Sequence, residues 1–223
     1  FYRGPMFRYE RPQKGRRRQF QQVGIEIIGV SETQADIETI ALGQHFLADL
    51  GIEKGITLEI NTLGDLESRT TYRGRLVNYL SDYQSKLSKD SALRLSQNPL
   101  RILDSKHEGD REIVAGAPLF KDSLNDESRR LFDDLLNGLT QLKLDYIVND
   151  RLVRGLDYYA HTAFEFTSRS LGAQSAVLAG GRYDGLISQM GGPEIPGIGW
   201  AAGVERLSLL LGNTHFLDRP ISV

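Results

Sequence analysis

The stretch that decides the fold comprises residues 7–26 and reads FRYERPQKGRRRQFQQVGIE. It carries cationic side chains around Pro12 and Gly15, and apolar residues resume on both sides. These cationic residues are Arg8, Arg11, Lys14, Arg16, Arg17 and Arg18. Because proline and glycine interrupt regular structure, the pattern predicts a cationic loop between two antiparallel strands. Guanidinium groups match phosphate and carboxylate oxygens two at a time, so this hairpin suits a polyphosphate. A solvated basic loop is the plainer alternative.

Composition limits the possible classes of protein. The 223 residues are 40% hydrophobic, which is enough for one large core, and the net charge of −2 restricts any RNA contact to local patches such as the arginine loop. The chain has no cysteine and only four scattered histidines, and we expect no structural metal. We find no apolar run of the roughly 20 residues that span a bilayer and no signal-peptide pattern. We therefore expect a cytoplasmic protein with no membrane segment. The opening Phe1, in place of methionine, indicates a fragment.

The first part of the chain alternates between strand and helix patterns. Residues 23–29 are predicted to form a strand antiparallel to residues 5–9, and helical spacing runs from Thr33 to Gly51. Residues 56–61 alternate as a strand. A carboxylate on a core strand is costly to bury, so Glu26 and Glu59 are candidates for the lining of a pocket.

The middle of the chain is predicted to be mainly helical. We expect one helix over residues 65–87 with Asp65 as its N-cap, and a short helix near residues 91–97. An exposed loop should follow over residues 105–111, and Asn125 should cap a further amphipathic helix. Strand patterns return at residues 146–149, 161–167, 176–178 and 198–202, and residues 204–211 form an apolar helix. The fold class is therefore α+β: a largely antiparallel β-sheet flanked by helices.

Three later runs contain candidate site residues. Residues 152–159 (LVRGLDYY) place an arginine before glycine and two tyrosines together, although packing of one tyrosine on the core is an alternative. Residues 179–186 (AGGRYDGL) suggest a structural ion pair between Arg182 and Asp184. Residues 196–207 (PGIGWAAGVERL) place glycines along a strand, which disfavours a dinucleotide-binding turn, and the chain contains no P-loop motif.

These runs resemble one known family. Residues 4–13 (GPMFRYERPQ) and 18–22 (RQFQQ) closely resemble motif 2 of the class II aminoacyl-tRNA synthetases, in the form found in histidyl-tRNA synthetases. The run RGLDYY resembles a signature peculiar to those enzymes, and residues 196–207 resemble motif 3. The motifs occur in the family order.

The resemblance implies roles for individual residues. It places Arg8, Glu10, Arg16 and Arg206 around ATP, with Arg8 on the α-phosphate. It places Gln22, Glu26, Arg154, Tyr158, Tyr159 and Tyr183 around histidine. Arg154 and Arg8 would be the catalytic cations. Pairing of Glu26 with an arginine such as Arg18 is the structural alternative.

The resemblance also implies activity and organisation. The expected activity is that of a histidine–tRNA ligase, which uses ATP, with Mg²⁺, to activate histidine and then transfers it to the 3′ end of tRNA(His). Residues 1–62 and 143–223 would form the catalytic core and residues 63–142 a helical insertion between motifs 2 and 3. Motif 1 and the anticodon-binding domain would lie outside this chain, and the full-length protein would be a homodimer.

Two other classes of protein remain alternatives. One is a non-catalytic histidine-sensing paralogue, such as the regulatory subunit of ATP phosphoribosyltransferase, although such a protein would be expected to lose Arg8, Arg16, Arg154 and Arg206. The other is a basic RNA-binding module, which would need a wider positive surface than a net charge of −2 suggests.

The resemblance leads to a first prediction, for Arg154. Replacement of this cation in Arg154→Ala should lower the rate of histidine adenylation by ~10²–10³, the range for the loss of one preorganised charge donor. The melting temperature should change little. The measurement is ATP–pyrophosphate exchange on the full-length protein, and an unchanged rate would remove Arg154 from the mechanism.

Overall fold

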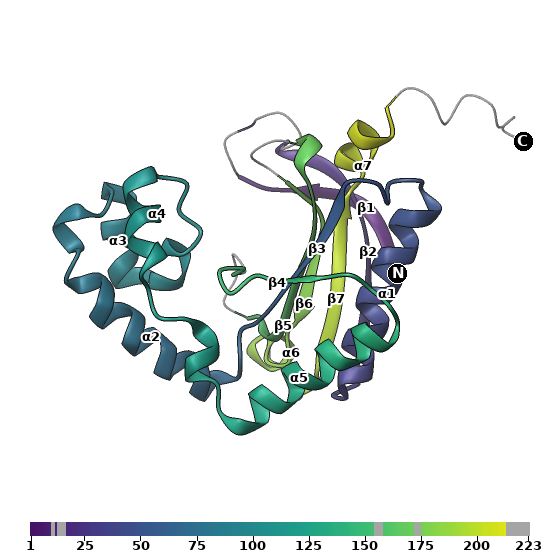
Figure 1. Cartoon of the computed structure of the whole chain (residues 1–223). Coiled ribbons are helices and arrows are strands. Elements are labelled where there is room, and N and C mark those ends of the chain that lie inside the picture. Colours follow the sequence, from purple (N-terminus) through teal and green to yellow (C-terminus); the bar gives the residue numbers. More distant parts are fainter. Residues whose placement is uncertain (10–11, 13–16, 154–157, 172–174, 213–223) are drawn as a thin grey trace, which may run out of the picture.

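The computed structural model describes residues 1–9, 12, 17–153, 158–171 and 175–212. In this part of the chain the strands form one sheet in the order β1-β2-β7-β6-β5-β3-β4 (Figure 1). Their bounds in that order are Tyr2–Phe7, Gln19–Ile28, Gly197–Gly203, Ala176–Arg182, Ala160–Ser168, Ile56–Thr62 and Ile147–Val148. Neighbouring strands are antiparallel, except that β4 runs parallel to β3. The predicted α+β class with a largely antiparallel sheet is confirmed.

Strands β1 and β2 form the hairpin predicted for the opening stretch. Their register pairs Tyr2 with Gly24 and Phe7 with Gln19. The backbone N–H of Arg8 donates to the carbonyl of Arg18 over 2.9 Å, which extends the hairpin by a further pair. The tip, residues 10–11 and 13–16, lies outside the described residues.

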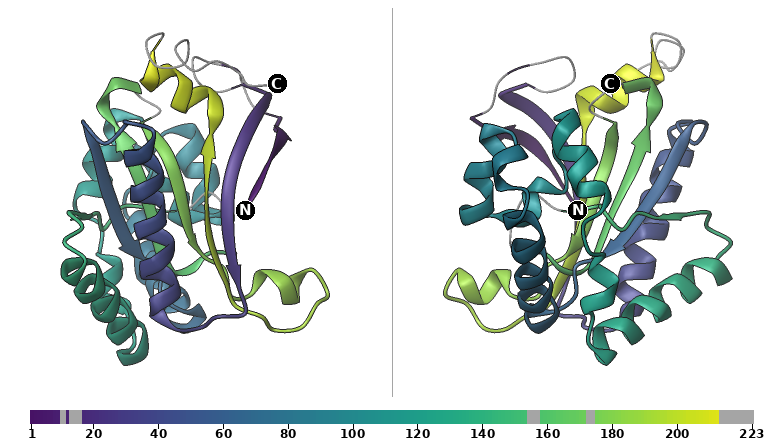
Figure 2. Two further views of the ribbon diagram at one scale, coloured as in Figure 1. Left: turned by 90° about the vertical axis from the view of Figure 1, so that its right-hand side faces the viewer. Right: turned by 60° about the vertical axis from the view of Figure 1, so that its left-hand side comes forward.

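Helix α1 (Thr33–Asp49) covers one face of the sheet (Figure 2). It ends before Gly51, whose φ of +73° is a conformation that glycine adopts without a steric penalty. The core below it contains Ile40, Phe166 and Trp200, and the indole of Trp200 donates to the carbonyl of Thr39 over 3.0 Å. Burial of these large side chains is the main source of the stability of this layer.

A buried ion pair joins α1 to the sheet. Arg182, at the end of β6, donates to Asp36, and both residues are almost completely buried. The predicted pair of Arg182 with Asp184 is also present at 3.1 Å. Carbonyl oxygens of Val30 and Glu32 accept from the same guanidinium. This network satisfies charges that would otherwise be costly to bury.

The helices between β3 and β4 belong to two hydrophobic cores. Helices α2 (Leu66–Ser81), α3 (Lys89–Gln97) and α4 (Glu108–Ala115) pack around Tyr72, Leu76 and Ile102, with short 3₁₀ helices between them and after α4. We call residues 66–124 the helical unit, and it lies on the side of the sheet opposite α1 (Figures 1 and 2). Helix α5 (Asp126–Gln141) packs against α1 instead, and its Leu135 and Leu139 lie in the sheet core. The predicted range 63–142 therefore includes helices of both cores.

Two details of the helical unit differ from the sequence prediction. The expected helix over residues 65–87 ends at Ser81 and is followed by a 3₁₀ helix, Gln84–Lys86. The expected exposed loop over residues 105–111 is correct only for residues 105–107, because α4 begins at Glu108 and the side chain of Asp110 is fully buried. The N-caps Asp65 and Asn125 are confirmed, since their side chains accept from the backbone N–H groups of Ser68 and Ser128.

Asp110 is buried because four donors surround its carboxylate. The backbone N–H of Ser88 and the hydroxyl groups of Ser88, Ser91 and Ser105 donate to it over 2.6–2.7 Å. Burial opposes ionisation, but these hydrogen bonds outweigh it and hold the pKa of Asp110 well below its usual range. A run of polar residues therefore forms an internal network that joins α3 to α4.

Two short helices complete the described fold. Helix α6 (Leu186–Gln189) follows β6, and α7 (Val204–Leu211) follows β7 over the predicted residues. In the described ranges, no helix combines the length and apolar character needed to cross a membrane.

The Asp110 network leads to a prediction about stability. Asp110→Ala should lower the free energy of unfolding of the helical unit by about 3 kcal/mol, because it leaves buried donors without an acceptor. Since the folded-state pKa is depressed, the contribution of the carboxylate is complete above the unfolded-state pKa of about 3.9 and is lost as the pH falls below it. Urea unfolding followed by circular dichroism measures both effects.

The matched control is Asp104→Ala, which removes an exposed carboxylate that pairs with Lys106 at 2.9 Å. Exposed pairs contribute about 0–1 kcal/mol. Equal losses in the two variants would mean that the Asp110 network does not stabilise the helical unit.

Candidate functional site

A cavity of about 700 Å³ lies on the face of the sheet opposite α1, over β2, β6 and β7. Strand alternation produces it, because successive side chains point to opposite faces. On β2, Gln22 and Glu26 line the cavity, whereas Val23 and Ile25 pack against the core. Gln22 and Glu26, four residues apart on one strand, therefore face the same space, as the sequence predicted.

Glycines form the floor of this cavity where side chains from neighbouring strands cross it. A Cβ atom on Gly199 would lie 1.8 Å from Oε2 of Glu26, and one on Gly197 would lie 2.4 Å from the ring of Tyr183. A Cβ atom on Gly181 would lie 2.9 Å from the ring of Tyr159. Only the absence of these side chains lets the carboxylate and the two phenol rings lie flat against the sheet.

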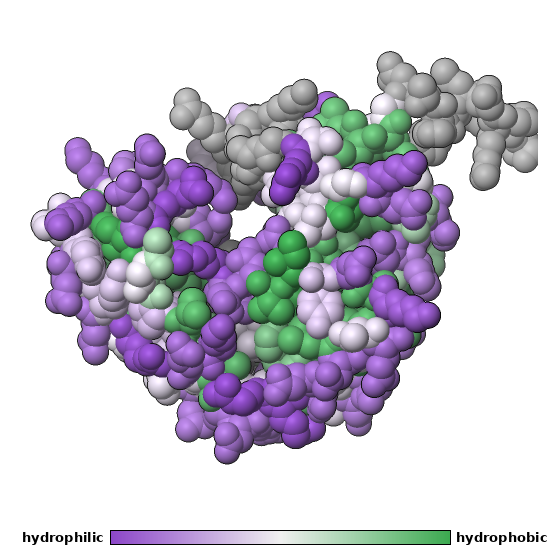
Figure 3. Space-filling view, in the orientation of Figure 1, coloured by the Kyte–Doolittle hydropathy of each residue, from purple (hydrophilic) through white to green (hydrophobic). Residues whose placement is uncertain are grey.

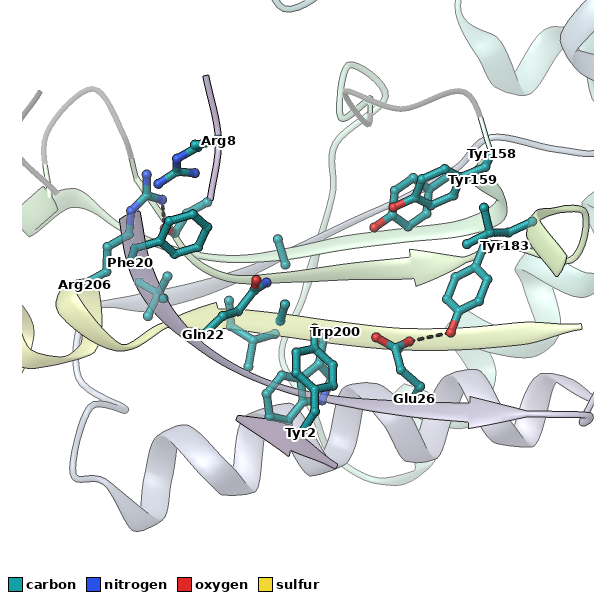
Figure 4. A pocket seen from close by; sticks show the side chains of 18 of the residues that line it. Tyr2, Arg8, Phe20, Gln22, Glu26, Tyr158, Tyr159, Tyr183, Trp200 and Arg206 are labelled. Carbon is teal, nitrogen blue, oxygen red and sulfur yellow. Dashed lines mark hydrogen bonds between the residues drawn. The ribbon is translucent and has the colours of Figure 1, made fainter. Parts of the chain in front are cut away.

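One end of the cavity is cationic. Arg8 lies with its Cζ 4.1 Å above the centre of the Phe20 ring, and its Nε donates to the carbonyl of Arg17 over 2.9 Å. Arg206, in the first turn of α7, lies at the same end and donates to the carbonyl of Ala176 (Figure 4). The ring and the carbonyl groups orient the two guanidinium groups. This end can bind an anion with more than one oxygen.

The other end of the cavity contains a carboxylate and three tyrosines. The hydroxyl of Tyr183 donates to Oε2 of Glu26 over 2.5 Å. The ring of Tyr158 lies 4.6 Å from that of Tyr159 and meets the ring of Tyr183 edge-on at 6.2 Å (Figure 4). The alternative in which Glu26 pairs with Arg18 is not observed, since Arg18 lies over the ring of Tyr9.

The pKa shifts follow from this enclosure. Burial raises the pKa of Glu26, and the hydrogen bond from Tyr183 offsets part of that rise. Burial and the bond to Glu26 raise the pKa of Tyr183, so this phenol stays protonated and remains a donor. An ionised Glu26 would still have lone pairs available for a ligand that carries N–H groups.

Most of the predicted site residues meet in this one cavity. The lining includes Arg8, Gln22, Glu26, Tyr158, Tyr159, Tyr183 and Arg206. Glu10, Arg16 and Arg154 lie outside the described residues. Glu59 does not line the cavity: it accepts from Asn149 over 2.5 Å and from Thr167 over 3.2 Å, and these bonds explain a carboxylate on that strand.

Several lining residues are not among those that the sequence predicted, and Tyr2, Phe20 and Glu205 are three of them. Tyr2 lies over Gly24, its partner across the hairpin, where a Cβ atom would lie 2.6 Å from the phenol. Both carboxylate oxygens of Glu205 accept from the backbone N–H of Gln21, at 2.9 and 3.2 Å, which fixes α7 against β2. For Tyr2, the available sequence signal was an aromatic residue paired with a glycine on the neighbouring strand, and this pairing can be recognised only when the register of the hairpin is known.

In the described ranges, no three histidine, aspartate or glutamate side chains are grouped so that they could hold a metal ion. The carboxylates in the cavity lining are Glu26 and Glu205, and each already accepts a hydrogen bond.

Comparison with known proteins gives the class of the fold and then the family. The structure is similar to an aminoacyl-tRNA synthetase, the apo histidyl-tRNA synthetase of S. aureus, with a TM-score of 0.73 and 36% identity over 94% of this chain and 50% of that one. Residues 1–207 match the family model described as histidyl-tRNA synthetase. The chain belongs to the histidyl-tRNA synthetase family.

Curated relatives agree with this membership. The chain is 60% identical to the histidine–tRNA ligase of Rhodospirillum rubrum and 56% identical to that of Gluconobacter oxydans, in each case over all of its own length. It spans 54% of the length of either relative.

The glycine floor leads to a prediction about packing. In Gly199→Ala the new Cβ would meet the carbonyl of Ile25 at 2.3 Å as well as Glu26, so the pairing of β2 with β7 must shift. We expect the free energy of unfolding to fall by about 2 kcal/mol, a typical cost of overpacking.

The control is Gly4→Ala on β1, where a Cβ atom would meet nothing within 4 Å. Urea titration of the two variants beside the parent protein makes the comparison. If Gly199→Ala is as stable as Gly4→Ala, the strands are not in the close contact described above.

Proposed function

We propose that the full-length protein activates histidine with ATP and then transfers it to the 3′ end of tRNA(His). The observation that carries this proposal is a single cavity with oriented arginines at one end and the Glu26–Tyr183 pair at the other. The arginines are complementary to the anionic phosphates of ATP. The carboxylate and tyrosine are complementary to an amino acid that has an ammonium group and a hydrogen-bonding side chain. Membership of the histidyl-tRNA synthetase family supports the pairing of these substrates.

The cationic end is proposed to bind ATP. Arg8 would hold the α-phosphate, since its guanidinium is already oriented by Phe20 and the Arg17 carbonyl. Arg206 would contact the nucleotide from α7. Glu10 and Arg16 would complete the site from the hairpin tip.

The opposite end is proposed to bind histidine. Glu26 would accept from an N–H group of the substrate, with Tyr183 holding the carboxylate in place. Gln22, on the same face of β2, would lie between the amino acid and the nucleotide (Figure 4). Tyr158 and Tyr159 would supply the aromatic wall.

The proposed chemistry has two steps. First, a carboxylate oxygen of histidine attacks the α-phosphorus of ATP, and the bond from that phosphorus to the bridging oxygen breaks, so that pyrophosphate leaves with the electron pair. Then a hydroxyl of the terminal ribose of the tRNA attacks the acyl carbon and releases its proton, the bond from that carbon to the phosphate oxygen breaks, and AMP leaves with the electron pair. Arg8 and Arg154 would stabilise the negative charge that develops in the first step.

Magnesium and the macromolecular partners belong to this proposal as well. Mg²⁺ would enter with the phosphates of ATP and would neutralise part of their negative charge. The full-length protein would act as a cytoplasmic homodimer.

The non-catalytic paralogue is the weaker alternative. One solved structure whose name includes an ATP phosphoribosyltransferase regulatory subunit, from Bacillus halodurans, has a TM-score of 0.52 at 21% identity, and this similarity concerns the fold alone. Arg8 and Arg206, two of the three arginines that line the described cavity, are present here. A histidine sensor would have no need of them.

Exchange kinetics test the proposal. The full-length protein should support ATP–pyrophosphate exchange that depends on histidine. Glu26→Gln should raise the KM for histidine by ~10–100-fold, as expected when a charge-assisted hydrogen bond of roughly 1.5–3 kcal/mol is weakened. The KM for ATP should move little, because Glu26 lies at the other end of the cavity.

The control is Glu38→Gln, which makes the same change of charge at an exposed position on α1. We expect both of its KM values to match the parent. Absence of histidine-dependent exchange in the parent protein would refute the proposed function, and equal effects of Glu26→Gln on both substrates would place Glu26 in the scaffold.

A further inference from the structure

Helix α2 of the helical unit contacts the backbone at the tyrosine end of the cavity. Nη1 of Arg69 donates to the carbonyl oxygen of Tyr159 over 2.8 Å, and Arg69 is half-buried. The ring of Tyr159 lies against the position where Gly181 has no side chain. A charge-assisted bond from the helical unit therefore holds the backbone of a residue whose ring lines the cavity.

A second connection reaches the helical unit from the segment before Tyr159. The guanidinium of Arg151 donates to the carbonyls of Val114 over 2.7 Å and of Ala115 over 3.1 Å, in the last turn of α4. The carbonyl of Val114 also accepts from the backbone N–H of Ala117 over 3.1 Å, and a cation is favourable at this end of the helix dipole. Val153 packs against the hydrophobic core of the helical unit.

The same segment is also bound to the sheet. The side chain of Asn61 on β3 donates to the carbonyl of Leu152 over 2.9 Å, and the backbone N–H of Asn149 donates to Ile60 over 2.8 Å. Residues 149–153 therefore bridge two bodies that have separate hydrophobic cores. In the space-filling view a short gap lies between the helical unit and the upper part of the sheet (Figure 3). The individual contacts of residues 149–153 therefore influence how the helical unit is oriented relative to the sheet.

The base of the helical unit is fastened close to the same strand. Asp65 and Asn125 are joined by a side-chain hydrogen bond of 2.8 Å. The backbone N–H of Leu63 donates to the carbonyl of His161, and the N–H of His161 donates to the carbonyl of Gly64. His161 follows Tyr159 by two residues, so the base of the unit and Arg69 hold consecutive parts of one strand.

We propose that Arg69 and Arg151 are positioning residues, through which the helical unit sets the place of Tyr159 and thereby the affinity of the cavity for histidine. This inference rests on the proposed function. Neither arginine lines the cavity, so neither would touch the substrate. The floor at Gly181 leaves the Tyr159 ring little room, and a displacement of the Tyr159 backbone therefore moves the ring within the cavity.

The test compares two arginines of α2 in the full-length protein. In Arg69→Gln the shorter side chain loses the hydrogen bond to the carbonyl of Tyr159. In Arg75→Gln the bonds lost are those to Asp122 and Ser123, which lie wholly within the helical unit. Isothermal titration with histidine, and separately with ATP, gives both Kd values, and exchange kinetics give both KM values. Thermal unfolding reports any loss of folding.

We expect Arg69→Gln to raise the Kd for histidine by ~10-fold, which corresponds to about 1.4 kcal/mol, with the Kd for ATP unchanged. Arg69→Lys should restore part of the affinity, since an ammonium can still donate to the carbonyl. Arg75→Gln should leave both Kd values as in the parent. Arg151→Gln should act in the same direction as Arg69→Gln, and their combined effect should be smaller than the sum, as for residues that act on one element.

Two results would overturn the inference. One is a Kd for histidine in Arg69→Gln that equals the parent value, and the other is an equal loss of affinity for histidine and ATP, which would indicate a purely structural role. If Arg69→Gln does not fold, Arg69→Lys and Arg151→Gln decide the question by the same comparison. Suppose that the parent protein shows histidine-dependent ATP–pyrophosphate exchange and that Arg69→Gln has the same Kd for histidine as the parent. This result would refute the inference about Arg69 and leave the proposed function intact.

Discussion

The alternation of residues along β7 is the constraint on which both faces of the sheet depend. Ile198, Trp200 and Ala202 point toward α1 and fill the core. The alternate residues Gly199, Ala201 and Gly203 are small and line the cavity, and Gly197 lies against the ring of Tyr183. Neighbouring strands lie about 4.8 Å apart, so a larger side chain on this central strand would occupy the space that Glu26 and Tyr183 reach from either side. One strand thus provides a filled layer and an open layer.

The partly or fully buried acidic residues of this fold fall into two groups, which differ in the number of hydrogen-bond donors around the carboxylate. Asp110 accepts four hydrogen bonds, and Asp36 is buried against Arg182. Each of these carboxylates is matched by its own surroundings. Glu26 accepts from Tyr183 alone within the described part of the chain, and it opens to the cavity. A carboxylate that is partly enclosed but has spare acceptor capacity suits a ligand rather than the fold.

The sequence was sufficient where the signal was local. The arginine hairpin, the caps Asp65 and Asn125, and the shared face of Gln22 and Glu26 all follow from spacing within a few residues. It was insufficient where the partner lies far along the chain. Asp110 looked exposed because Ser88 and Ser91 lie about 20 residues away, Asp36 meets Arg182 only in the folded sheet, and the contribution of Tyr2 depends on its place opposite Gly24. Glu59 shows the converse error, since a polar residue on a strand can be satisfied internally.

The two ends of the helical unit are held together by an exchange of caps. Asp65 caps α2 by accepting from the backbone N–H of Ser68, and Asn125 caps α5 by accepting from that of Ser128. The hydroxyl of Ser68 in turn accepts from the backbone N–H of Asn125, and the hydroxyl of Ser128 accepts from that of Asp65. The chain therefore leaves the sheet and returns to it at nearly the same point. A polypeptide built in this way is modular: the chain between Ser68 and Leu124 could change in length without stretching the strands on either side. The junction makes the size of this segment free to vary while the sheet below it stays the same.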